Sequence, residues 1–123
     1  MQAGGVFLAP TLQALKSKNL LVPAPDPEHI FIVSNDGIPH EYDAIGKGEI
    51  DATVSQPADL NANYALFYAK AALEGKTFQP GPTDHNSTIV SVGNGVLEDQ
   101  FAAPLVTKEN VDDPSLWGNQ IGK

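Results

Sequence analysis

The chain reads HIFIVSNDG at residues 29–37 and EIDATVSQP at residues 49–57. Each stretch has an apolar strand pattern that ends in polar side chains: Asn35 and Asp36 in the first, Gln56 in the second. The segment between them suits a short helix, so the order strand–helix–strand predicts parallel pairing through a right-handed crossover. In open α/β sheets, ligands bind beyond the carboxyl ends of the strands. We therefore expect these three side chains to meet at one edge of a sheet.

The chemistry of Asp36 and Gln56 indicates a hydroxyl-rich ligand. An ionised aspartate only accepts hydrogen bonds, whereas a glutamine amide both donates and accepts, so together they can hold neighbouring hydroxyl groups. The spacing of these residues alone is equally compatible with a simpler interpretation. Asp36 can be a turn or N-cap residue, and Gln56 a linker residue before Pro57.

The rest of the sequence completes an α/β fold with a parallel sheet of about four strands and three helices. The apolar run His29–Val33 is typical of a strand covered on both faces, with Asn35-Asp36-Gly37 as the turn that ends it. We expect three helices: one over 6–18 with Pro10 in its first turn, one from Pro39 to Ile45, and one from Ala58 to Glu74 with an apolar stripe at Leu60, Tyr64, Phe67 and Ala71. The remaining strands are expected over 50–54, 87–92 and 103–107, with a turn at Asn94-Gly95.

Composition excludes several classes of function. The chain has 123 residues, enough for one modest domain, and its lack of cysteine excludes disulfides and thiolate chemistry. Its net charge is −8 and it contains no arginine, so we expect no nucleic-acid partner. No apolar run is long enough to span a membrane.

Catalytic and metal-binding motifs are also missing from the sequence. Gly46-Lys47 is followed by Gly48 instead of Ser or Thr, so the segment does not match the phosphate-binding loop motif. The G-x-S-x-G motif that carries the nucleophile of α/β-hydrolases does not occur either. The three histidines are far apart in sequence and lack an i, i+4 partner. We expect no catalytic residue, no metal site and no cofactor, and hence a binding protein, not an enzyme.

The stretch from Ile32 to Gly75 resembles the ribose-binding-protein-like family of periplasmic sugar-binding proteins, the substrate receptors of ABC importers. The resemblance is carried by the Asn35-Asp36-Gly37 turn, by KGEIDATVSQP at residues 47–57 and by the helix that follows. The tail, PLVTKENV at residues 104–111 and then WGN at 117–119, looks like the ending of several of the family's sugar and polyol receptors.

This resemblance implies a type I periplasmic-binding-protein-like fold whose two lobes close on a monosaccharide or polyol. Asp36 would accept from two ring hydroxyls, with Asn35 beside it and Gln56 contacting another hydroxyl near the hinge. Ser55 and Pro57 would belong to a crossing between the lobes. It also implies an ABC transporter permease as membrane partner, and a periplasmic location or an extracytoplasmic lipoprotein.

Members of this family are more than twice as long as this chain, and the part that lacks a counterpart is their N-terminal half. We expect Met1 to be an internal methionine of a longer reading frame, with the signal peptide outside this chain. On this mapping, residues 1–57 form the end of the C-terminal sugar-binding lobe. Residues 58–123 hold a hinge crossing, elements of the other lobe and the tail. Such a fragment exposes sheet edges, so we expect a homo-oligomer or domain-swapped assembly.

Two alternatives remain open. The effector-binding core of a LacI-type transcriptional regulator has a related fold, and an N-terminal basic helix-turn-helix would distinguish it. A small α/β enzyme with Asp36 as acid or base would need a second titratable group near the strand ends, for which only Asp51, Glu49 or a histidine is available.

Overall fold

The computed structural model describes residues 4–121 and consists of two compact units. Unit 1 joins the chain up to Gln56 with the stretch from Pro104 onward, and unit 2 is Pro57–Ala103. The division expected from the sequence placed the tail with residues 58–103. In the structure the tail packs in unit 1, because its strand pairs with the sheet there.

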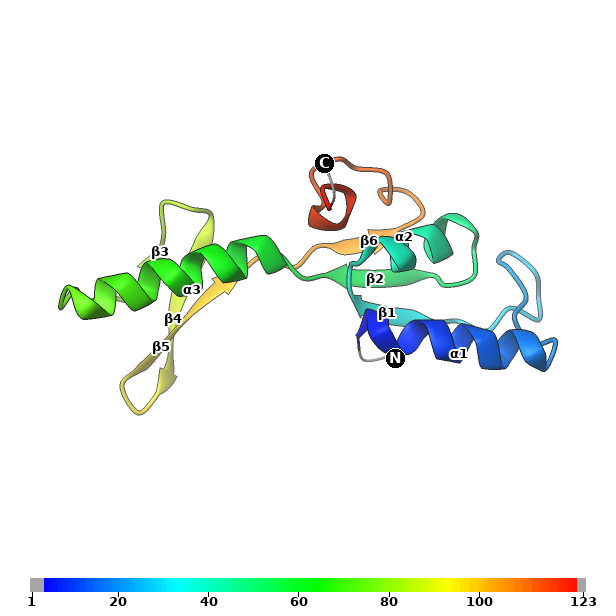
Figure 1. The fold of residues 1–123 in the computed structure, drawn as a ribbon, viewed down its shortest axis with the longest axis horizontal. Coiled ribbons are helices and arrows are strands. Elements are labelled where there is room, and N and C mark those ends of the chain that lie inside the picture. The colour runs from blue at the N-terminus through cyan, green and yellow to red at the C-terminus, as the bar shows by residue number, and fades with distance from the viewer. Residues whose placement is uncertain (1–3, 122–123) are drawn as a thin grey trace. The chain divides into compact units, whose positions relative to one another are not determined.

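Unit 1 is an α/β unit around a three-stranded sheet of order β1-β2-β6 (Figure 1). β1 and β2 are parallel, as the strand–helix–strand pattern predicts, and β6 is antiparallel to β2. The expected parallel sheet is thus only partly correct: the sheet is mixed, with parallel pairing between β1 and β2 and an antiparallel strand β6. The elements of unit 1 are α1 (Gly5–Ser17), β1 (Val33–Asp36), α2 (Pro39–Gly46), β2 (Ala52–Ser55), β6 (Leu105–Thr107) and the 3-10 helix η1 (Trp117–Asn119).

A fully buried carboxylate fixes the connection between β1 and α2. Glu41 Oε2 accepts from the backbone N–H groups of Gly37 and Ile38 at 2.6 and 2.8 Å, and Oε1 accepts from the Thr53 hydroxyl at 3.1 Å. The first two donors would otherwise be unsatisfied at the start of a helix. The third lies in β2, so this one side chain ties the turn after β1, helix α2 and the neighbouring strand together.

Both α-helices of unit 1 cover the same face of the sheet. Ser34 pairs with Thr53 and Asp36 with Ser55 across the parallel register, so these four side chains share a face. Thr53 and Ser55 reach α2, and Asp36 reaches the start of α1. The apolar core beneath the helices consists of Leu8, Leu12, Tyr42, Ala44, Ile45, Ile50, Val106, Val111 and Leu116.

The apolar run at 29–33 is not the strand that its composition predicts, because β1 begins only at Val33. The Asp51 carboxylate accepts from the Ile32 N–H at 2.7 Å and lies 3.1 Å from the His29 ring, and this holds the preceding chain in a loop. Phe31 is 74% exposed, so the run is not covered on both faces.

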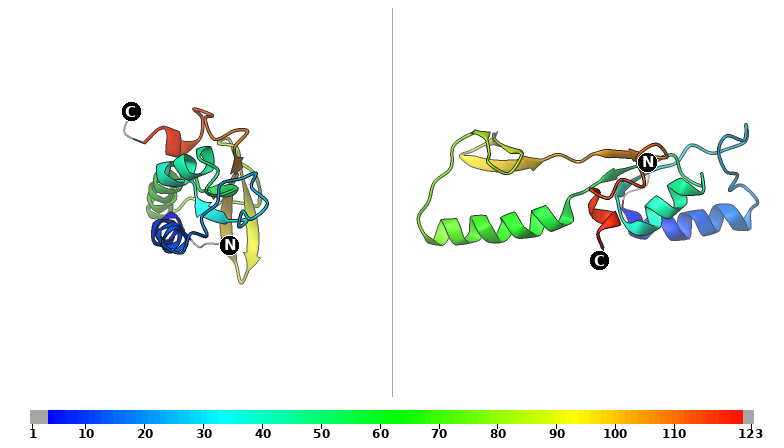
Figure 2. Two further views of the ribbon diagram at one scale, coloured as in Figure 1. Left: turned by 90° about the vertical axis from the view of Figure 1, so that its right-hand side faces the viewer. Right: turned by 90° about the horizontal axis from the view of Figure 1, so that it is seen from above.

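Two further local expectations are wrong. Asn35 and Asp36 are the last residues of β1 and not a turn, because the Asp36 carbonyl accepts from the Gln56 N–H at 2.9 Å and extends the pairing. Pro10 is the sixth residue of α1, beyond the first turn, and the helix continues through it (Figure 2). Pro10 and Val6, whose carbonyl loses its i+4 donor, are both exposed, so water can satisfy that carbonyl.

Unit 2 consists of α3 (Ala58–Leu73) and a second three-stranded sheet, antiparallel and ordered β3-β4-β5. β3 is Gly81–Pro82, β4 is Ser87–Gly93 and β5 is Val96–Phe101. The predicted turn at Asn94-Gly95 is confirmed. Both of its residues have positive φ, 53° and 75°, as a two-residue hairpin turn requires. The described chain thus has six strands and not about four, because β3 and the polar strand β5 carry little apolar signal.

Helix α3 is confirmed within one residue, but its apolar stripe is mostly uncovered. Of the four stripe residues only Ala71 is buried, whereas Leu60 and Phe67 are 37% and 47% exposed. Leu66 and Leu73, outside the stripe, are 73% and 90% exposed. Across residues 4–121, no helix combines the length and the apolar character needed to cross a lipid bilayer.

We predict that Glu41→Gln destabilises unit 1 by about 2 kcal/mol, because the charge-assisted hydrogen bonds that Glu41 accepts become weaker neutral ones. Urea unfolding monitored by the fluorescence of Trp117, the only tryptophan, measures this change. The exposed Glu28→Gln is the matched control. Equal unfolding midpoints for the two variants would contradict the role assigned to Glu41.

Candidate functional site

The three residues singled out by the sequence meet at the carboxyl ends of β1 and β2. Gln56 Nε2 donates to Asn35 Oδ1 at 3.1 Å, and Asn35 Nδ2 donates to Asp36 Oδ1 at 3.0 Å. Asp36 and Gln56 do not bond side chain to side chain; Asn35 links them. All three side chains are half-buried, so a polar cluster lies at this edge of the sheet and remains accessible.

The Asp36 carboxylate also lies at the N-terminus of α1. Its Oδ2 accepts from the Gly5 N–H at 2.8 Å, which satisfies one of the helix's free donors and places the negative charge at the positive end of the helix dipole. The simpler interpretation of Asp36 as a helix-capping residue is thus partly right, but the helix it caps is α1 and not the one that begins at Pro39.

The backbone of Asp36 is held from two sides. Its carbonyl accepts from the Gln56 N–H at 2.9 Å and from the indole N–H of Trp117 at 3.1 Å. Next to the indole, η1 packs tightly on the turn after β1: a Cβ on Gly118 would lie 2.2 Å from the Gly37 carbonyl oxygen. The tail therefore fixes the strand end that carries Asp36.

The cluster keeps hydrogen-bonding capacity for a ligand. A carboxylate has about four acceptor positions, and Asp36 uses one on each oxygen. Gln56 Oε1 and the second amide hydrogens of Asn35 and Gln56 have no partner among the bonds the structure shows for the described residues. The cluster can therefore accept and donate side by side, which suits hydroxyl groups.

The two predicted hinge residues flank Gln56 in different surroundings. Ser55 is buried in β2, and its hydroxyl lies 3.0 Å from the Tyr42 hydroxyl. Burial raises the pKa of Tyr42 and the Ser55 contact opposes this rise. Pro57 is the first residue of unit 2. Their role as a hinge stays a prediction.

Gly5 and Trp117 belong to the site but were not predicted from the sequence. They lie 31 and 81 residues from Asp36. Neither has a local signal for this contact: an N–H at a helix start is generic, and no pattern around Trp117 indicates what its indole N–H will meet.

Unit 2 has a separate cluster centred on the Asp99 carboxylate. Asp99 Oδ2 lies 2.9 Å from both His85 Nε2 and the Tyr68 hydroxyl, and Oδ1 accepts from the Ser87 hydroxyl. The Tyr64 ring stacks on His85 with centroids 3.7 Å apart. Ser87 bonds the carboxylate and not the histidine, so the cluster lacks the serine–histidine hydrogen bond of a nucleophile–base pair.

Charge pairing shifts the pKa values in this cluster. The hydrogen bond to Asp99 is the largest cause of the raised pKa of His85, whose other ring nitrogen lies 2.9 Å from Asp84 Oδ1. Burial raises the pKa of Asp99, but the hydrogen bonds from His85, Ser87 and Tyr68 outweigh it and the net shift is downward. Burial and the Asp99 contact raise the pKa of Tyr68 to about 12.

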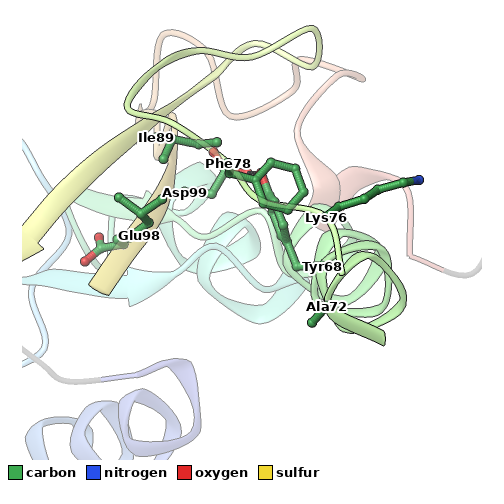
Figure 3. Close-up of a pocket in the computed structure, with 8 residues that line it drawn as sticks. Tyr68, Ala72, Lys76, Phe78, Ile89, Glu98 and Asp99 are labelled. Atoms are coloured by element: carbon green, nitrogen blue, oxygen red, sulfur yellow. Dashed lines mark hydrogen bonds between the residues drawn. The ribbon is translucent and has the colours of Figure 1, made fainter. Parts of the chain in front are cut away.

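A hollow of about 330 Å³ lies beside this cluster, between α3 and the hairpin of unit 2 (Figure 3). Tyr68 and Phe78 line it from one side and Ile89 and Asp99 from the strands. The lining of the hollow is mainly apolar, although Lys76 and Glu98 also border it, and Asp99 already has three donors.

No protein-family model matches the chain, and no curated protein matches it either. Within residues 4–121, no group of three or more histidine, aspartate or glutamate side chains is arranged to hold a metal ion.

We predict that unit 2 loses stability at both ends of its pH range. The stabilisation from His85 is fully present below its ordinary pKa of 6.5 and is lost as the pH rises through its raised folded-state pKa. The stabilisation from Asp99 is present above 3.8 and is lost as the pH falls through its lowered pKa.

Hydrogen-exchange protection factors of the β4 and β5 amides, measured across this range, test the prediction. His85→Gln should abolish the loss at higher pH. His29→Gln is the control, because His29 also has a raised pKa but lies in unit 1. Protection in unit 2 that does not change above pH 6.5 would contradict the assignment.

Proposed function

We propose that this chain is the solute-binding component of an ABC sugar importer, or a part of one, with a monosaccharide or polyol as its ligand. The observation that carries this proposal is the linked cluster of Asp36, Asn35 and Gln56 at the carboxyl ends of two parallel strands. Its free acceptors and donors lie side by side, as vicinal hydroxyl groups require. The resemblance of residues 32–75 and of the tail to sugar receptors supports the same function.

The type I periplasmic-binding-protein-like fold is part of this proposal. The parallel β1–α2–β2 unit is compatible with a sheet of that kind, and the ligand position at the strand ends follows the general rule for open α/β sheets. An ABC permease as membrane partner and a periplasmic or lipoprotein location follow from the resemblance alone.

The test is calorimetric titration of the protein with a panel of pentoses, hexoses and their polyols. Asp36→Asn should weaken binding by about 10- to 100-fold, because it removes a charged acceptor. Asp43→Asn, which alters an exposed carboxylate in the same unit, should leave affinity unchanged. Failure of the unmodified protein to bind any sugar or polyol, at millimolar concentration, would refute the function.

We also propose that the chain self-associates, as a homo-oligomer or by exchange of elements. Support comes from the exposed apolar side chains of α3 and from the free edges of both three-stranded sheets among the described residues. The expected result in size-exclusion chromatography with light scattering is a mass at least twice 13.0 kDa. Leu66→Lys with Leu73→Lys should shift the mass toward the monomer. A single 13.0 kDa peak at all concentrations would refute self-association.

A further inference from the structure

One side of α3 carries an exposed apolar row. Ala62, Leu66, Ala69 and Leu73 follow one another at steps of four, three and four residues, so they lie along a single face of the helix. All four are exposed, Leu66 to 73% and Leu73 to 90%. Ala71, the buried residue of α3, lies on the opposite face, and the right-hand view of Figure 2 shows strands along only one side of the helix. These four exposed residues form the outer row of α3.

The outer row is complementary to itself when a second copy of α3 runs antiparallel to the first. If a twofold axis passes between Leu66 and Ala69, Leu66 of one copy faces Ala69 of the other, and Leu73 faces Ala62. Each large side chain then meets a small one, which lets two helices pack closely without gaps. A parallel pair in register would instead place leucine on leucine and alanine on alanine.

The charges at the two ends of α3 favour the same orientation. Asp59 is exposed in the first turn, whereas Lys70 and Lys76 lie near the other end and are 78% and 62% exposed. Both lysines share the Glu74 carboxylate, at 3.7 and 2.7 Å, so that end keeps a net positive charge. An antiparallel pair brings Asp59 of each copy to the positive end of the other and sets the helix dipoles in opposition. A parallel pair would bring like charges together.

We propose that two copies of this chain pair through the outer rows of their α3 helices, antiparallel and about a twofold axis between Leu66 and Ala69. This inference rests on the proposed self-association and identifies the surface that carries it. Helix α3 has 16 residues and is therefore about 24 Å long, so a single helix pair lies at the low end of the size range of specific interfaces. The dimer is accordingly reversible and exchanges its subunits.

Disulfide formation between introduced cysteines tests the orientation, because the chain has no cysteine of its own. In the antiparallel pair, position 62 of one copy faces position 73 of the other. The two copies of position 62 lie about 16 Å apart along the helix axis, too far for a disulfide, and the same holds for position 73. Mild oxidation of Ala62→Cys protein mixed with Leu73→Cys protein should therefore give a covalent heterodimer, identified by its mass, much faster than either protein alone gives a homodimer.

The matched control is Asn61→Cys mixed with Leu73→Cys. Asn61 is also exposed on α3, one residue from Ala62, but it lies on a different face of the helix. This mixture should form disulfides no faster than the single variants.

A charge reversal tests the pairing of the helix ends. Asp59→Lys should raise the dissociation constant of the dimer about three- to tenfold, because it places like charges together at both ends of the pair. Glu109→Lys makes the same charge change at an exposed residue of unit 1 and should leave the dissociation constant unchanged. Sedimentation velocity over a concentration series measures both variants, and circular dichroism verifies that they are folded.

The outcomes separate this inference from the self-association on which it rests. Homodimers of each single-cysteine protein that form as fast as the heterodimer would refute the antiparallel orientation. A dimer in sedimentation, with no faster disulfide formation in the Ala62→Cys mixture than in the control, refutes the outer row as the interface and leaves self-association standing. Equal dissociation constants for Asp59→Lys and Glu109→Lys refute the pairing of the helix ends. A monomer at all concentrations overturns both proposals and leaves the outer row to a different protein.

Discussion

The site depends on the buried carboxylate of Glu41. Its three acceptor bonds join the turn after β1, the start of α2 and strand β2, so the two parallel strands end at a fixed position relative to each other. All three donors are neutral, so the hydrogen bonds themselves must offset the desolvation of the buried carboxylate. This connection reinforces the pairing of β1 with β2, which brings Asp36 and Gln56 to one edge of the sheet.

Asp36 has a structural role at the place where we propose that the ligand binds. It caps α1 through Gly5, and its carbonyl anchors the tail through Trp117, while about half of its acceptor capacity remains free. A site of this kind is rigid because its side chains are already hydrogen-bonded, and rigid polar groups bind a ligand at a lower entropic cost.

Unit 2 is organised around a carboxylate as well, but in a different way. Asp99 is paired with His85, whose own second ring nitrogen lies beside Asp84, so this network depends on protonation. Aromatic contacts such as Tyr64–Phe101 and Tyr68–Phe78 accompany it, but most large aliphatic side chains of α3 and the hairpin are exposed. The exposed apolar side chains of unit 2 are typical of a surface that binds another protein surface.

The sequence by itself determined the elements with strong local signals: α2 from Pro39, α3 to within one residue, the Asn94-Gly95 turn, and the parallel pairing around Asp36 and Gln56. Propensity and periodicity act over a few residues, so they suffice there. Only the tertiary structure decided where long-range contacts override these local preferences. Asp51 holds the apolar run before Val33 in a loop, β6 pairs antiparallel with β2, and Gly5 and Trp117 converge on Asp36. These contacts join residues 19 to 81 positions apart, and no short window of sequence records which distant partner a donor or acceptor will meet.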